Sequence, residues 1–104
     1  IRAVRDHLAD CLMVLPALLA EKDQAPLHFY FATMTGIRRQ LFPALVEAYE
    51  ESLIRSNASR LKQVVREGAR HWLESASQIL GAYRRGAAGS GVTLSTEMSD
   101  RLKF

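Results

Sequence analysis

The sequence predicts an all-α fold, an up-and-down bundle of three to four main helices followed by a short tethered helix. Near the N-terminus, apolar residues recur in steps of three and four, at Ile1, Val4, Leu8, Cys11, Leu15 and Leu18. A similar spacing returns later in the chain, at Leu61, Val65, Gly68, Trp72, Ile79 and Tyr83. Because this period places apolar side chains on one face of an α-helix, that face must be buried. Short turns between such helices favour antiparallel neighbours.

The composition is that of one ordinary globular domain. The chain has 104 residues, 48% of them hydrophobic and 24% charged, and its net charge of +3 permits an acidic partner without requiring one. The longest apolar run, residues 11–20, contains a proline and is half as long as a membrane span, so we expect no membrane association. The single cysteine excludes an internal disulfide and favours a cytoplasmic location.

Prolines interrupt the first two helical segments. We expect a first helix over residues 1–22 with a kink at Pro16, because a proline inside a helix removes a hydrogen bond and crowds the preceding turn. A second segment begins near Leu27 and ends near Arg55; Gly36 weakens it, and Pro43 either kinks or splits it.

A polar break then precedes the longest helix. Residues 56–59 read Ser-Asn-Ala-Ser, and Asn57 or Ser59 suits the N-cap of a helix over residues 58–85. We therefore expect a bundle over residues 1–85, a Gly/Ser-rich linker over 86–91, and a short amphipathic segment over 92–104 that needs a surface to dock on.

The spacing also predicts the core. Small residues such as Gly68, Ala69 and Ala76 should let helices approach closely. The residues that we expect to be buried are Leu8, Leu12, Leu15, Met34, Leu41, Leu45, Tyr49, Leu61, Val65, Trp72 and Ile79.

No pattern of catalytic or metal-binding residues emerges. His7 and Cys11 share a helix face, but no third or fourth ligand follows at a zinc spacing, so we interpret them as a surface histidine beside a core cysteine. None of the three histidines accompanies a nucleophile in a glycine-flanked turn. The sequence therefore predicts neither an enzyme nor a bound metal or cofactor.

Two surface features suggest macromolecular partners. Lys62, Arg66 and Arg70 recur every fourth residue with Arg60 nearby, a basic face that could contact phosphates, although no helix-turn-helix pattern accompanies it. Four consecutive aromatic side chains, His28, Phe29, Tyr30 and Phe31, cannot all face one core. One or two should therefore meet a partner chain, the C-terminal tail or a small apolar ligand, unless the helix is central and buried on several sides.

Residues 71–82 resemble the active helix of histidine phosphotransfer domains, which are helical bundles of about this size. The matching positions are His71, Leu73, Ser77, Leu80, Gly81 and Ala82. The resemblance implies that His71 accepts a phosphoryl group. The family's lysine and glycine are replaced by Glu74, which would repel phosphoryl charge, and by Ser75, which narrows access to the imidazole.

We therefore expect a non-enzymatic helical interaction or regulatory module that forms a homodimer. Its expected contact residues are the aromatic patch at 28–31 and the tethered Leu94, Met98 and Leu102, which suit exchange between protomers or capture by a groove. Phosphotransfer by His71 and nucleic-acid binding by the basic face remain as alternatives.

Overall fold

The protein is all-α throughout the part of the chain that the structure describes. A computed structural model describes residues 2–84 and 101–104, and no strand occurs among them. The helical elements are α1 (Arg2–Ala9), the π-helical turn η1 (Asp10–Val14), α2 (Leu15–Ala20), α3 (Ala25–Thr33), α4 (Gly36–Leu41), α5 (Pro43–Arg55) and α6 (Ser59–Arg84). The predicted linker and most of the tethered segment, including Leu94 and Met98, lie outside the described residues.

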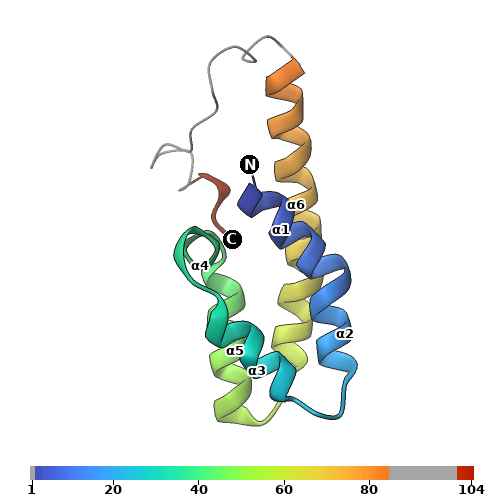
Figure 1. Cartoon of the computed structure of the whole chain (residues 1–104), viewed down its shortest axis with the longest axis vertical. Coiled ribbons are helices and arrows are strands. Elements are labelled where there is room, and N and C mark those ends of the chain that lie inside the picture. The colour runs from blue at the N-terminus through green and yellow to red at the C-terminus, as the bar shows by residue number, and fades with distance from the viewer. Residues whose placement is uncertain (1, 85–100) are drawn as a thin grey trace.

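Helix α6 is the longest element, and the others pack along it. At 26 residues it is about 39 Å long. The elements α1, η1 and α2, which together we call the first limb, lie along one flank of α6, and α5 lies along the other (Figure 1). Its start at Ser59 confirms the predicted helix over residues 58–85 to within one residue. The predicted break is also confirmed: Ser56 has a φ of 52°, and the Asn57 side chain accepts a hydrogen bond from the Ser59 N–H at 2.9 Å.

The first limb contains a π turn directly before Pro16, the residue at which the sequence predicts a kink. The Leu15 N–H donates to the Asp10 carbonyl, five residues earlier, and Pro16 then lies in the first turn of α2. A wide turn placed just before a proline gives its ring room and accommodates its missing N–H. The limb ends at Ala20, where Glu21 becomes extended.

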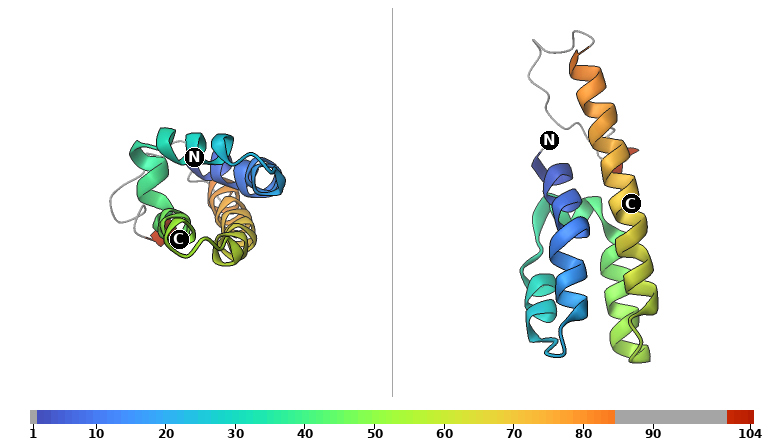
Figure 2. Two further views of the ribbon diagram at one scale, coloured as in Figure 1. Left: turned by 90° about the horizontal axis from the view of Figure 1, so that it is seen from below. Right: turned by 90° about the vertical axis from the view of Figure 1, so that its right-hand side faces the viewer.

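The second predicted segment divides into three helices. Met34 is extended and Gly36 has a φ of +63°, a left-handed conformation that favours glycine, so α3 ends before Thr35 and α4 begins after it. Pro43 then starts α5, since a proline fits the first turn of a helix. Seen from below, α3 and α4 cover one side of the molecule (Figure 2).

The core lies where the first limb, the α4–α5 junction and α6 meet. Most of the predicted core is confirmed: Leu15, Met34, Leu41, Leu45, Leu61, Val65 and Trp72 are buried, and Leu8, Tyr49 and Ile79 pack against them while partly exposed. The prediction for Leu12 is wrong, because it is 58% exposed. Cys11 occupies the core position, and the next residue in a helix points about 100° away.

Candidate functional site

The structure places a buried histidine at the centre of the molecule. The prediction that His7 lies on the surface is wrong: it is fully buried, between Val4 and Cys11 on the core face of the first limb. Its ring stacks on Trp72 with centroids 5.0 Å apart and meets the edge of Phe42 at 5.2 Å. The polarity of an imidazole favours a surface position, but the spacing of His7 from Val4 and Cys11 matches the apolar stripe.

A hydrogen bond fixes the orientation of the His7 ring. Nε2 donates to the Arg38 backbone carbonyl at 2.7 Å, so Nε2 carries the proton in the neutral ring. Nδ1 has no hydrogen-bond partner within the described residues. The buried imidazole thus ties α1 to α4 across the core.

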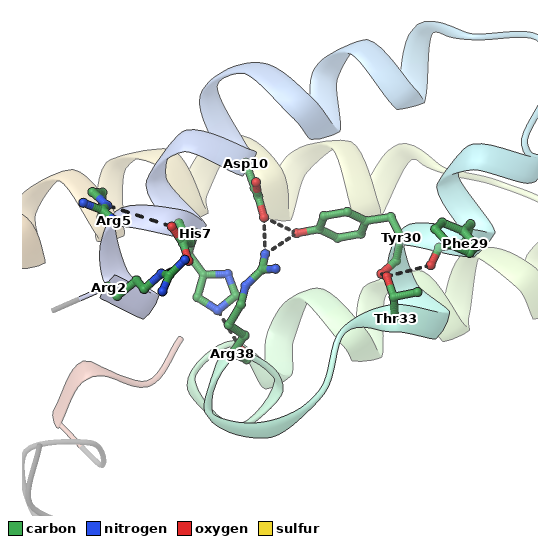
Figure 3. A network of polar contacts seen from close by, with 9 residues as sticks. Arg2, Arg5, His7, Asp10, Phe29, Tyr30, Thr33 and Arg38 are labelled. Carbon is green, nitrogen blue, oxygen red and sulfur yellow. Dashed lines mark hydrogen bonds and ion pairs between the residues drawn. The ribbon is translucent and has the colours of Figure 1, made fainter.

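Arg38 also joins a polar cluster beside this histidine. Its guanidinium pairs with the Asp10 carboxylate, and the Tyr30 hydroxyl donates to the same carboxylate at 2.8 Å (Figure 3). Burial and the negative charge of Asp10 raise the pKa of Tyr30, so this phenol stays protonated as a donor. The cluster connects η1, α3 and α4, and its two opposite charges, both partly buried, pair with each other.

Burial lowers the pKa of His7. The Arg38 carbonyl hydrogen bond and the carboxylates of Asp10 and Asp6 oppose this effect, while the Arg38 charge adds to it. An unfolded chain therefore takes up a proton near the ordinary histidine value of about 6.5 before the folded chain does. Acid favours the state that binds more protons, so folding loses stability as the pH falls below about 6.5.

We expect this loss to disappear when His7 is replaced by phenylalanine. The free energy of unfolding of the natural protein should fall more steeply between about pH 7 and pH 5 than that of H7F, as measured by urea denaturation. The carboxylates and the other two histidines are common to both proteins, so the difference between the two slopes reports His7. Parallel curves would contradict the assignment.

Cys11 lacks the properties of a nucleophile or a metal ligand. Burial and the nearby Asp10 charge raise the pKa of its thiol to about 12, which keeps it protonated at neutral pH. Within residues 2–84 and 101–104, no group of three histidine, cysteine or carboxylate side chains is placed to hold a metal ion.

His71 lies under the C-terminal residues. It is half-buried, its Nε2 donates to the Leu102 carbonyl at 2.7 Å, and its ring stacks on Phe104 at 4.7 Å. The Phe104 N–H donates to the Leu41 carbonyl at 2.9 Å, and its own carbonyl accepts from the Ala44 N–H. Phosphotransfer at Nε2 would therefore require residues 101–104 to move away. Leu102, expected to contact a partner, is buried against its own chain.

The side chains of the aromatic patch, residues 28–31, divide between the core and the surface. This agrees with the expectation that four consecutive side chains of a helix cannot all face one core. Phe31 is buried and stacks on Tyr49 with centroids 3.9 Å apart, and His28 Nδ1 lies 2.7 Å from the Tyr49 hydroxyl. Tyr30 belongs to the polar cluster described above. His28 and Phe29 are both exposed, and the exposed fraction of Phe29 is 69%.

The four residues of the predicted basic face are all exposed, but they do not form one face. Lys62, Arg66 and Arg70 follow each other along α6. Arg60 lies about 160° around the helix from Lys62, because each residue advances the helix by about 100°. No ion pair involves any of these four within the described residues.

One family model matches the chain, over residues 1–101, and its description is "Family of unknown function (DUF6866) C-terminal domain". The chain belongs to this family. No curated protein and no solved structure matches it. In the described part of this DUF6866 C-terminal domain, no helix has the length and apolarity needed to cross a bilayer.

Proposed function

We propose that this domain is a non-enzymatic interaction module that forms a homodimer through α3. The supporting observation is that the exposed surface of α3 is apolar or neutral. The helix has no aspartate, glutamate, lysine or arginine in its nine residues, and Phe29 is exposed at its middle. In a protein of net charge +3, such a face can meet its own copy without like-charge repulsion.

The geometry of α3 also suits two-fold packing. Pro26, Phe29 and Thr33 are exposed and follow steps of three and four, so they lie on the same side of the helix. The Thr33 hydroxyl donates to the Phe29 carbonyl at 3.0 Å, so this polar group needs no partner from another chain. A two-fold contact would set Phe29 of one protomer against the same face of the other.

Introducing a charge at Phe29 should dissociate the dimer. We expect the natural protein to sediment as a dimer at high micromolar concentration, and F29E to sediment as a monomer with an unchanged helical circular dichroism spectrum. The control is I54E at the end of α5, where the side chain is also exposed. A natural protein that remains monomeric at high micromolar concentration would contradict the dimer.

The proposal that His71 accepts a phosphoryl group has a direct test. The protein is incubated with a phosphorylated response regulator and analysed for an acid-labile label. A label that the natural protein acquires and H71Q does not would establish phosphotransfer. Absence of label would end this alternative.

A further inference from the structure

The surface where the first limb meets α6 carries a second apolar strip, which we call the α1–α6 seam. From the first limb it includes Leu8, Leu12, Pro16 and Leu19, and from α6 it includes Ala69, Leu73, Ala76, Leu80 and Tyr83. The α6 residues alternate steps of four and three, which places them on one side of the helix. Leu73 is 57% exposed and Leu12 is 58% exposed, and no described residue covers their outer surfaces. Other members of the strip pack partly against the core, namely Leu8, Leu19, Ala69 and Ala76.

The seam is concave at both ends. One groove of about 450 Å³ lies between the start of α1 and the end of α6, and its lining includes Val4, Ala76, Leu80 and Tyr83. A second groove of about 260 Å³ lies between α2 and the start of α6, and it is lined mainly by Pro16, Leu19 and Val65. The first limb and α6 run side by side between these grooves (Figures 1 and 2). Such hollows accept apolar side chains presented by another helix.

The borders of the seam are basic. Arg2 and Arg5 line the first groove, and Lys62 and Arg66 line the second. Glu67 and Glu74, the carboxylates of α6, lie about 100° or more around the helix from Leu73. The Asp6 carboxylate lies 3.9 Å from both Arg2 and Arg5, so one negative charge faces two positive ones.

We propose that the α1–α6 seam binds an acidic amphipathic helix of a partner protein. Apolar side chains of that helix would fill the two grooves, and carboxylates along its edges would pair with the arginine and lysine side chains at their borders. The small Ala69 and Ala76 side chains would let its backbone approach α6. This inference rests on the proposed role as an interaction module and adds the chemistry of the partner.

Charge and shape favour this occupant over two others. A second copy of the chain would bring the same positive borders against these ones, which repel each other. A bilayer surface is attracted by lysine and arginine, but it does not supply the separate side chains that two hollows receive.

The probe is a fluorescent helical peptide of about 22 residues, with leucine at the a and d positions of each heptad and glutamate at the flanking positions. Its matched control has lysine in place of every glutamate. Fluorescence anisotropy should show that the acidic peptide binds at least about tenfold more tightly than the basic peptide. This preference should shrink as the salt concentration is raised.

Two pairs of variants locate the binding surface. L73D should weaken binding of the acidic peptide about tenfold or more, while L53D, at an exposed leucine of α5, should leave it unchanged. The double variant K62E/R66E should weaken binding by a similar factor, whereas R60E, on another side of the same helix, should not. These positions are all exposed, so circular dichroism should show that each variant remains folded.

Several outcomes would overturn the proposal. These are equal affinity for the acidic and basic peptides, undiminished binding by L73D, and binding to phosphatidylserine vesicles with none to the acidic peptide. A dimer that F29E dissociates, combined with no peptide binding, would refute the seam and leave the α3 dimer intact. Peptide binding by a strictly monomeric protein would refute the dimer and retain the seam.

Discussion

Replacing Trp72 with alanine should lower the free energy of unfolding by about 3–5 kcal/mol, the usual loss when a fully buried aromatic side chain is truncated. Trp72 has no exposed surface, and it is among the largest fully buried side chains within the described residues. Three aromatic rings contact it: His7 stacks on it, and the edges of Phe42 and His71 meet it. The truncation would therefore leave a cavity bordered by α1, by the α4–α5 junction and by α6 itself.

The expected loss in W72A is a large fraction of the total free energy of unfolding of a domain. A chain of this length has an unfolding free energy of about 5–15 kcal/mol, and each kcal/mol shifts the melting temperature by roughly 4–8 °C. We therefore expect W72A to melt roughly 12–40 °C below the natural protein. The measurement is thermal and urea unfolding followed by far-ultraviolet circular dichroism, at one fixed protein concentration because association shifts apparent stability.

The matched control is the next residue in the same helix. L73A removes a leucine that is more than half exposed, so it should change the unfolding free energy by only about 0.5 kcal/mol. If W72A were no less stable than L73A, the position of Trp72 at the centre of the core would be wrong.

Replacing Gly68 should produce a graded loss of stability that depends on Phe42. A Cβ atom at position 68 would lie 2.5 Å from Phe42 Cζ and 3.0 Å from Cys11 Sγ, closer than such atoms normally come. Phe42 is fully buried and contacts His7, Trp72 and Phe104, so its ring cannot move away cheaply. We expect G68V to lose about 2–3 kcal/mol, in the range of overpacked cores.

The smaller substitution separates packing from helix propensity. G68A gains about 1 kcal/mol because alanine favours the helix, so its net loss should be smaller than that of G68V. F42L removes the tip of the ring that the new methyl group would meet. The loss in G68A/F42L should therefore be smaller than the sum of the two single losses, which urea denaturation of all four proteins would measure. Strict additivity would show that Phe42 does not limit the space at position 68.

The histidines show how far the sequence predicts the site. The pattern predicts that Trp72 anchors the core and that the aromatic run at 28–31 divides its faces, and the structure confirms both. The sequence pattern does not predict that His7 lies in the core, because the carbonyl that accepts the Nε2 hydrogen bond belongs to Arg38, 31 positions away. The contact of His71 with Leu102 spans the same separation and is equally invisible in local spacing.

The sequence by itself determined that the chain is helical and where the longest helix begins. The apolar steps of three and four specify α6, Asn57 and its neighbours specify its start, and Pro43 starts α5, because each of these signals acts within a few residues of the backbone. Only the tertiary structure decided that Gly68 is packed against Phe42, that Asp10 pairs with Arg38 and that Leu12 and Leu73 of the α1–α6 seam stay uncovered by the described residues. These contacts join residues far apart in the chain, and whether two such residues meet depends on how all the helices pack together.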